Sequence, residues 1–535
     1  MLELPVPRPG ERARAPALHG SSDALALANL AQREHPLLVV TESAWHAQRL
    51  LAEIPFFAPA LRVCLFPDWE TLPYDQFSPH QDLVSERMAA LHQMLHNQFD
   101  VAIVPVTTAL YRLPPVEYLA AHTFFFKQGE RLAPDELRRQ LTLAGYAHVT
   151  QVVAPGEYSF RGGLIDLFPM GSALPYRIDL LDDEIETIRS FDVDTQRSIY
   201  KVNDVRLLPA REFPMDEAAQ KRFRHRFRER FEGDPSKSRV YKDVSKGVPP
   251  AGIEYYLPVF FDNTALITDY LPETTLVCMQ GNIAGAIDQF WQDTHARYAM
   301  LRGDRSNPVL PPHDLFLTVE DFFGTIKPYR RIELTAAGAE ATDPTPALTA
   351  RPVPSPTAPS PVLSVERRAQ DPLHRLRDFL NNFPGRVLLL AESLGRRETM
   401  SEFFAEYGMK PALAPSFDEF VAATERLMLG VGPLQAAFVL TDEALAIVTE
   451  NELYATQART RAARDARRVT NEGMLRDLAE VKVGDPVVHE QHGIGRYVGL
   501  ASMDLGEGET EFLTLEYAGN DKLYVPVSSL HLISR

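Results

Sequence analysis

The first candidate for chemistry is a glycine-containing loop near the N-terminus. The loop is expected to connect a first strand to a first helix, as a phosphate-binding loop does, and it consists of Gly20, Ser21, Ser22, Asp23 and Ala24. In a working loop of this kind a lysine and a magnesium-binding hydroxyl occupy the positions of Asp23 and Ala24. A carboxylate that faces a triphosphate reverses the required electrostatics, so we expect this degenerate loop to bind no nucleotide. A simple helix cap in the same place predicts the same absence of activity.

The other candidates for catalysis are weak. No segment matches an intact phosphate-binding motif, a nucleophile elbow, a zinc-binding helix or a paired-cysteine cluster. His489 and His492 have no third ligand nearby, so they are better explained as polar residues at strand ends than as metal ligands. Asp182, Asp183 and Glu184 are typical of a polar turn. We therefore expect no catalytic residue, no metal site and no bound cofactor in this chain.

The composition is that of a multidomain protein without a membrane span. A chain of 535 residues exceeds what one hydrophobic core usually supports. The apolar content is 45%, and no run approaches the roughly 18 apolar residues of a membrane-spanning helix. Cys64 and Cys278 cannot build a disulfide framework, and the Pro- and Arg-rich start lacks the apolar core of a secretory signal. A cytoplasmic protein is expected.

The net charge limits nucleic-acid binding to local sites. A formal charge of -17 argues against a chain that coats nucleic acid over its whole surface. Two basic clusters stand out: Lys221–Arg230 has six basic residues and Arg459–Arg468 has five arginines. Each lies in a helix-compatible segment, and a solvated helix face explains such a cluster.

The first part of the chain alternates between apolar runs and helical patterns. Such alternation predicts a parallel, doubly wound sheet. Two later apolar runs, 265–268 and 275–278, return to the composition of buried strands, so the first domain is expected to be discontinuous. The expected early strands are 37–40, 63–66 and 101–104, and the expected helices between them are 43–54 and 85–97.

A segment of different character lies between these two parts. At 155–169 an arginine, Arg161, and two turn glycines precede an apolar strand. Two further strands, 176–181 and 186–191, follow with a polar turn between them. The pattern predicts a small α/β module with antiparallel hairpins, suited to docking rather than catalysis. A β-turn that merely feeds a core strand remains the plainer alternative.

The second half of the chain has three parts. Seven prolines fall within 344–361, a composition that favours an extended linker. Strands and helices between 386 and 441 then predict a compact α/β domain, and an arginine-rich helix follows. Four or five short strands separated by glycine predict a C-terminal SH3-like or Tudor-like β-barrel. The expected divisions are 1–125 and 213–335 for the discontinuous domain, 126–212 for the inserted module, 336–368 for the linker, 369–455 for the compact domain, 456–480 for a linker helix and 481–535 for the barrel.

Four long motifs follow one another along the chain, at 65–75, 155–169, 245–256 and in the barrel segments from 483 to 530. Together they resemble one family, the bacterial transcription-repair coupling factors. The resemblance covers nearly the whole chain, and its first half is similar to the excision-repair protein UvrB. It implies a UvrB-like first domain with a degenerate phosphate loop. Only about ten residues separate Tyr74 from Glu86, which leaves little room for the damage-probing hairpin of UvrB.

The resemblance implies two docking sites. The inserted module is expected to bind UvrA through Arg161, Arg177 and Leu181, where two guanidinium groups suit carboxylates on the partner. Leu181 stands where the family often has phenylalanine, and a core role for Arg177 is the alternative. The barrel resembles a CarD-type domain, which implies contact with the β subunit of RNA polymerase through Met503 and Leu505. Met503 alternatively packs within the barrel.

These features lead to one main hypothesis and two alternatives. The chain is expected to be a monomeric, non-catalytic adaptor in transcription-coupled nucleotide excision repair, holding stalled polymerase and recruiting UvrA. Full-length family members continue into an ATP-driven DNA translocase, so ATP, magnesium and most DNA contacts are expected of that part alone, and this chain is expected to be a fragment or a truncated gene product. A UvrB-like ATPase acting on damaged DNA is the enzymatic alternative. A CarD-type regulator accounts only for the barrel.

Overall fold

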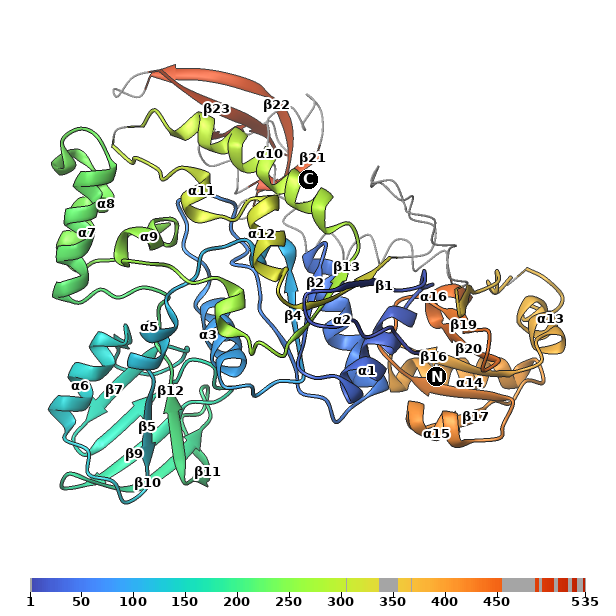
Figure 1. The fold of residues 1–535 in the computed structure, drawn as a ribbon. Coiled ribbons are helices and arrows are strands. Elements are labelled where there is room, and N and C mark those ends of the chain that lie inside the picture. Colours follow the sequence, from blue (N-terminus) through green and yellow to red (C-terminus); the bar gives the residue numbers. More distant parts are fainter. Residues whose placement is uncertain are drawn as a thin grey trace. The chain divides into compact units, whose positions relative to one another are not determined.

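A computed structural model shows two compact units, Met1–Leu453 and Tyr454–Arg535 (Figure 1). Among the residues that it describes, no helix is both long and apolar enough to cross a membrane. The described residues are 2–304, 306–335, 355–366, 368–454, 486–489, 493–504, 509–517, 522–526 and 533–534.

The first domain is built on a parallel sheet whose strands come from both ends of an interrupted sequence. Its order is β1-β14-β13-β2-β4-β3, and every neighbouring pair is parallel. Cys278 on β13 stands opposite Val39 on β2, more than 200 residues earlier, and both are buried. The parallel, discontinuous sheet expected from the sequence is therefore confirmed. Its strands are β1 Arg12–Arg14, β2 Leu37–Thr41, β3 Val63–Leu65, β4 Val101–Pro105, β13 Leu276–Gln280 and β14 Arg330–Leu334.

Helices connect these strands and pack around the sheet. Serine and threonine N-caps begin several of them; for example, the Ser43 hydroxyl accepts the amide of His46 at 3.3 Å at the start of α2. The helices of this domain are α1 Ser22–Arg33, α2 Ala44–Phe57, α3 Gln81–Leu95, α4 Val106–Ala109, α5 Val116–Ala121, α7 Glu217–Arg230, α8 Arg239–Ser245, α9 Leu257–Phe260, α10 Ile283–Leu301, α11 Pro312–Leu315 and α12 Val319–Ile326.

One expected strand of this domain is wrong. Residues 265–268 do not extend the sheet; Ala265 forms an isolated bridge with Leu113, and Ile267–Tyr270 is a 3-10 helix. The Asp269 carboxylate accepts the amide of Leu266 at 2.7 Å and so fixes the start of that turn. Short apolar runs are equally compatible with a strand and with a buried turn of helix, which is why periodicity misassigned this one.

The inserted module contains a six-stranded sheet of order β11-β10-β9-β8-β7-β6 beside a two-stranded pair, β12 and β5. All neighbouring pairs of the larger sheet except β6 and β7 are antiparallel. Leu137 and Leu141 of α6 (Pro134–Leu143) are buried in one core with Ile165 and Ile178, so α6 packs on one face of the sheet. The strands are β5 Phe124–Lys127, β6 Ala147–His148, β7 Glu157–Arg161, β8 Leu164–Leu167, β9 Tyr176–Leu181, β10 Glu184–Phe191, β11 Ser198–Val202 and β12 Asp204–Leu207.

A buried ion pair fixes the module to the first domain. Arg87 of α3 contacts Glu212, just after β12, through Nε–Oε1 at 2.5 Å and Nη2–Oε2 at 3.2 Å. Trp69 Nε1 also donates to the Glu212 carboxylate at 3.0 Å, and the Arg87 guanidinium lies 4.2 Å from the centroid of the Phe66 ring. A buried ion pair whose two groups are also hydrogen-bonded has one well-defined geometry. The module therefore has a defined position relative to the first domain.

A third sheet follows in the same unit, with order β15-β19-β20-β16-β18-β17. Thr357 on β15 is buried and pairs with Leu440, although the sequence placed residues 357–359 in the proline-rich linker. An edge strand tolerates proline because its outward amide needs no partner. The elements are β15 Thr357–Pro359, α13 His374–Asn382, β16 Arg386–Ala391, α14 Leu394–Glu406, β17 Ala412–Ala414, α15 Phe417–Ala422, β18 Leu427–Val431, β19 Phe438–Leu440, β20 Leu445–Thr449 and α16 Glu450–Leu453.

The second unit is an antiparallel five-stranded sheet of order β24-β23-β22-β21-β25. Val487, Tyr497, Leu513 and Val525 are buried in its own small core. The all-β C-terminal domain expected from the sequence is therefore confirmed. The expected linker helix at 456–480 lies outside the described residues. The strands are β21 Pro486–His489, β22 Gly493–Asp504, β23 Glu509–Glu516, β24 Lys522–Pro526 and β25 Ile533–Ser534.

Candidate docking face and a covered phosphate loop

The glycine pair at 162–163 builds the hairpin that presents Arg161. Gly162 has φ +63°, a left-handed conformation, and a Cβ on Gly163 would lie 2.9 Å from the carbonyl oxygen of Leu180. The two glycines join β7 to β8, and Arg161 pairs with Leu164 across the turn. Arg161 lies at the end of β7, on the face opposite to the inward-pointing Ile165.

A single buried carboxylate holds both arginines. The side chain of Asp166 is 1% exposed and forms ion pairs with Arg161 and Arg177. Arg177 binds it with two nitrogens, Nε–Oδ1 at 2.7 Å and Nη2–Oδ2 at 2.9 Å. Its Nη1 donates to the carbonyl of Gln196 at 3.1 Å, and its guanidinium lies 4.8 Å from the centroid of the Phe191 ring. The hydrogen bonds that Arg177 donates to the Asp166 carboxylate raise the pKa of Arg177 above its ordinary value, so Arg177 stays charged.

Exposure separates the roles of the three residues expected to bind the partner. The side chain of Arg161 is 51% exposed, whereas that of Arg177 is only 16% exposed. Leu181, at the end of β9, is 65% exposed. Arg177 and Leu181 are both on the outward face of β9, because they are four residues apart along a strand. Arg161 and Leu181 are therefore available to a partner, and Arg177 mainly orients Asp166.

Two cations on this face were not recognised from the sequence. In the sheet register Arg189 on β10 stands opposite Arg177 on β9, and Lys201 on β11 stands opposite Arg189. Side chains along the strand at 186–191 point alternately to the two faces of the sheet. Because Ile188 is in the core, its neighbour Arg189 faces outward. No sequence pattern reveals which residue of β11 pairs with it, because the strands shift register between Arg189 and Phe191.

The glycine loop near the N-terminus leads into α1, as expected from the sequence, but its polar groups are used internally. The carboxylate of Asp23 binds Arg49 Nη1 at 2.9 Å and also forms an ion pair with Nη2 of the same guanidinium. Arg49 Nη1 also reaches Glu53 Oε2 at 2.6 Å. Burial raises the pKa of Glu53 to about 7. In place of a phosphate-binding lysine the loop therefore has Asp23, which forms a buried cluster with Arg49 and Glu53 of α2.

The domain built on the third sheet, from β15 to α16, is called the third domain, and its backbone covers this loop. The amide of Ser21 donates to the carbonyl of Ala436 at 3.1 Å, and the amide of Ala436 donates to the Ser21 hydroxyl at 3.2 Å. The amide of Gln435 donates to Glu53 at 2.9 Å. Gly20 has φ +53°, and a Cβ there would overlap the carbonyl of Ala437. The loop keeps its glycine because another domain approaches closely at this point.

The hollow that remains beside the loop is unsuited to a phosphate. Asp23 and Glu452 both line it, and His19 is the only lining residue in the described part of the chain that can carry a positive charge. An anion here would face two carboxylates at short range.

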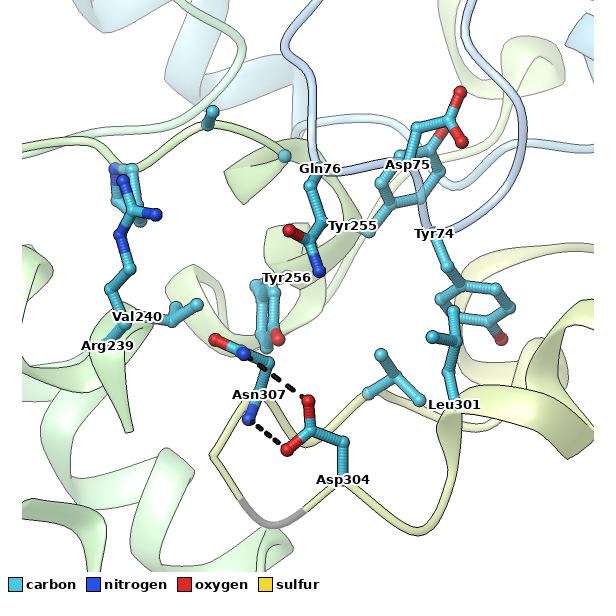
Figure 2. Close-up of a pocket in the computed structure, with 14 residues that line it drawn as sticks. Tyr74, Asp75, Gln76, Arg239, Val240, Tyr255, Tyr256, Leu301, Asp304 and Asn307 are labelled. Atoms are coloured by element: carbon cyan, nitrogen blue, oxygen red, sulfur yellow. Dashed lines mark hydrogen bonds between the residues drawn. The ribbon is translucent and has the colours of Figure 1, made fainter. Parts of the chain in front are cut away.

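A second hollow lies in the first domain, beside the short connection from Tyr74 to Glu86 (Figure 2). Its tyrosines are fixed through their hydroxyls: Tyr74 donates to Leu310 at 2.9 Å, Tyr255 to Leu72 at 2.7 Å and Tyr256 to Pro308 at 2.7 Å, each to a carbonyl oxygen. Burial raises the pKa of each tyrosine well above its ordinary value. Figure 2 shows Asn307 bonded to Asp304 on one side of the hollow and Arg239 on the other.

The remaining candidate residues are placed as follows. Met503 is in β22, opposite Thr510 on β23, and Leu505 lies outside the described residues. The basic cluster at 221–230 forms α7, whose Arg222 donates to the carbonyl of Phe260 at 2.9 Å; the cluster at 459–468 and His492 lie outside the described residues. Within the described ranges no three His, Cys, Asp or Glu side chains gather as metal ligands would.

Three protein families match separate parts of the chain. Residues 124–213 match the UvrB interaction domain, residues 379–453 match the MFD D3 domain, and residues 481–535 match the CarD-like/TRCF RID domain. The first range contains the module with Arg161, the second contains the third sheet domain from within α13 to α16 but without β15, and the third contains the five-stranded unit.

Curated relatives match almost the whole chain. It is 42% identical over 535 residues to the transcription-repair-coupling factor of Escherichia coli K12 and 40% identical over 523 residues to that of Haemophilus influenzae. The factor of Bacillus subtilis is 26% identical over 534 residues. These matches cover 99%, 96% and 95% of this chain but 46%, 44% and 43% of the respective relatives, so the chain spans about half the length of the relatives it matches.

Proposed function

We propose, from this chain's membership of the transcription-repair-coupling factor family, that it works as the adaptor part of a coupling factor in transcription-coupled nucleotide excision repair. Its inserted module recruits UvrA, and its C-terminal five-stranded unit holds stalled RNA polymerase through the β subunit. The chain acts in the cytoplasm and as a monomer.

The observation that carries this proposal is the state of Arg161. Its guanidinium is half exposed, while the buried carboxylate of Asp166 fixes its direction. A guanidinium group that is already oriented loses little side-chain entropy when it binds a carboxylate on a partner. Leu181 adds an exposed apolar contact on the same face. Leucine has less area than the ring common in the family, so its contribution is smaller than that of a phenylalanine.

The test is a binding titration of UvrA against this chain and an Arg161→Ala variant. We expect the substitution to weaken binding by about tenfold or more, as for a central arginine in an interface. Arg139→Ala is the matched control, because Arg139 lies on α6 and forms only an exposed ion pair with Glu136. Equal affinities of the Arg161→Ala variant and the unmodified chain would exclude the proposed face.

The polymerase contact is proposed to lie at the end of the β22–β23 hairpin. Met503 is near the end of β22, and Leu505 follows it two positions later in the sequence. A methionine adapts its flexible side chain to an apolar groove on a partner. The β subunit is the part of polymerase that we propose to meet these residues.

Nucleotide hydrolysis and DNA translocation are proposed for the other part of the full-length relatives. The competing hypothesis of a UvrB-like ATPase receives no support from the loop at 20–24. There Asp23 is paired with Arg49, and the third-domain backbone covers Ser21. ATP and magnesium are accordingly proposed as cofactors of the remaining domains alone.

A further inference from the structure

A row of three cations crosses the outer face of the inserted module. Arg177 on β9, Arg189 on β10 and Lys201 on β11 are opposite one another in the sheet register. Side chains at paired positions on adjacent strands lie on the same face with Cβ atoms about 5 Å apart. The row therefore runs from the pair Arg161–Asp166 to the edge of the sheet, since β11 is an edge strand.

Carboxylates of the module neutralise only one end of the row. Asp166 is bonded to Arg161 and Arg177. Asp179, the other carboxylate that faces outward from β9, accepts the Thr187 hydroxyl at 2.7 Å. For Arg189 and Lys201 the described residues supply no ion pair.

Arg189 is the unusual member of the row. Its Nε is buried and has no hydrogen-bond partner among the described residues. Like charges directly opposite each other on neighbouring strands are unfavourable, and so is a buried donor without an acceptor. A carboxylate from outside the chain would relieve both.

Apolar side chains flank the row. Leu181 is 65% exposed at the end of β9, and Ile199, two residues before Lys201 on β11, is 53% exposed. A phosphate backbone would gain little from them, and a chain of net charge -17 is poorly suited to bind nucleic acid broadly. A protein surface that combines carboxylates with apolar residues complements all of these groups.

We propose that Arg189 and Lys201 bind an acidic stretch of the partner protein, which lies across β9, β10 and β11 and covers Ile199. This inference rests on the proposed function, since the partner is the same protein that Arg161 engages. Arg177 holds the near end of the row in place through Asp166, and the two unpaired cations extend the docking face to the sheet edge.

The experiment measures UvrA binding to the full chain at several salt concentrations, with Lys201→Glu and Arg189→Glu as variants. Each charge reversal is expected to weaken binding by about tenfold or more and to reduce its salt dependence. Arg139→Glu makes the same charge change on α6, which packs on the opposite face, and is expected to bind as the unmodified chain does. Lys201 is exposed, so its variant is expected to unfold at the same temperature as the unmodified chain.

The outcomes separate the two proposals. If Arg161→Ala weakens binding while Lys201→Glu and Arg189→Glu match the Arg139→Glu control, the cation row is overturned and the proposed function stands. If Arg161→Ala also has no effect, the proposed docking function itself fails. A short DNA duplex serves as the second probe: loss of duplex binding in Lys201→Glu with unchanged UvrA affinity would assign the row to nucleic acid and overturn the inference.

Discussion

At the scale of single residues, burial has given ordinary side chains unusual roles. Asp166 is a buried carboxylate that binds two arginines, and Arg161 is the more exposed of the two. Glu53 of α2 is a buried carboxylate that forms an ion pair with Arg49 beside the loop at 20–24. It accepts the Ser21 hydroxyl at 2.8 Å and the Gln435 amide at 2.9 Å, so it links the first and third domains.

The elevated pKa of Glu53 predicts a pH-dependent stability. Burial raises this pKa from 4.5 to about 7, so between these values the folded chain binds a proton that the unfolded chain lacks. Stability from this group is therefore complete below pH 4.5 and is lost as the pH rises through 7. The loss approaches about 3 kcal/mol for a shift of this size. Glu254, whose pKa burial also raises to about 7, acts in the same direction at a separate place.

Chemical denaturation at about pH 5.5 and about pH 8.5, on either side of the raised pKa, checks this prediction. The unmodified chain is expected to be less stable at the higher pH, and Glu53→Gln is expected to show a smaller difference between the two conditions. The exposed Glu406→Gln is the control and should behave as the unmodified chain does. An identical pH dependence in Glu53→Gln would show that Glu53 ionises normally in the folded state.

At the scale of elements, the loop at 20–24 is a joint between domains. Ser21 and the neighbouring Glu53 form hydrogen bonds with the segment 435–437, and Gly20 lies so close to it that a Cβ would overlap the carbonyl of Ala437. Phe57 of α2 and Phe417 of α15 pack edge to face with ring centroids 4.9 Å apart close to the same joint. One core cluster contains residues of both sheets.

Gly20→Ala is expected to loosen this joint. A left-handed φ at a residue with a side chain costs about 1 kcal/mol, and the new Cβ would also overlap the carbonyl of Ala437. Gly10→Ala is a matched control, because Gly10 also has a left-handed φ, +78°, but a Cβ there would meet no other atom within 4 Å. Hydrogen exchange of the segment 432–437 should therefore rise in Gly20→Ala and stay unchanged in Gly10→Ala. Equal exchange rates in both variants would mean that the third-domain backbone moves away from the new Cβ without a measurable loss of stability.

The sequence predicted the elements better than the contacts between them. The strands around Val39 and Cys278 were recognised because parallel strands buried on both faces are continuously apolar. The run at 265–268 is equally apolar but forms a turn of helix, since Asp269 caps it. The absence of a lysine from the phosphate loop was visible in the sequence. Its coverage by Ala436 was not, because the two segments are separated by more than 400 residues.

The docking face was likewise only partly predictable. Arg161 and Leu181 follow from the resemblance to known proteins and from strand alternation. The bidentate ion pair between Arg177 and Asp166 forms because β8 and β9 pair in a register that sets these two residues opposite each other. The sequence alone does not give that register. The pairing of Arg189 with Lys201 depends on a register shift that local propensity does not encode.

At the scale of the whole molecule, the two proposed docking sites belong to different compact units. Arg161 is in the unit Met1–Leu453 and Met503 is in the unit Tyr454–Arg535. The second unit has its own core of Val487, Tyr497, Leu513, Leu515 and Val525. Substitutions at surface positions of units with separate cores have independent effects on stability and binding. A substitution that abolishes binding at one docking site should therefore leave binding at the other site unchanged.

A crossed experiment tests this independence. Arg161→Ala is expected to weaken UvrA binding by about tenfold or more and to leave polymerase binding unchanged. Met503→Arg is expected to do the reverse, because an arginine in an apolar groove brings an unpaired charge into the interface. Both variants are titrated against UvrA and against the polymerase β subunit. If either substitution weakens both interactions while thermal unfolding stays normal, the two sites are coupled, and the chain cannot be the simple two-ended adaptor that its separate cores imply.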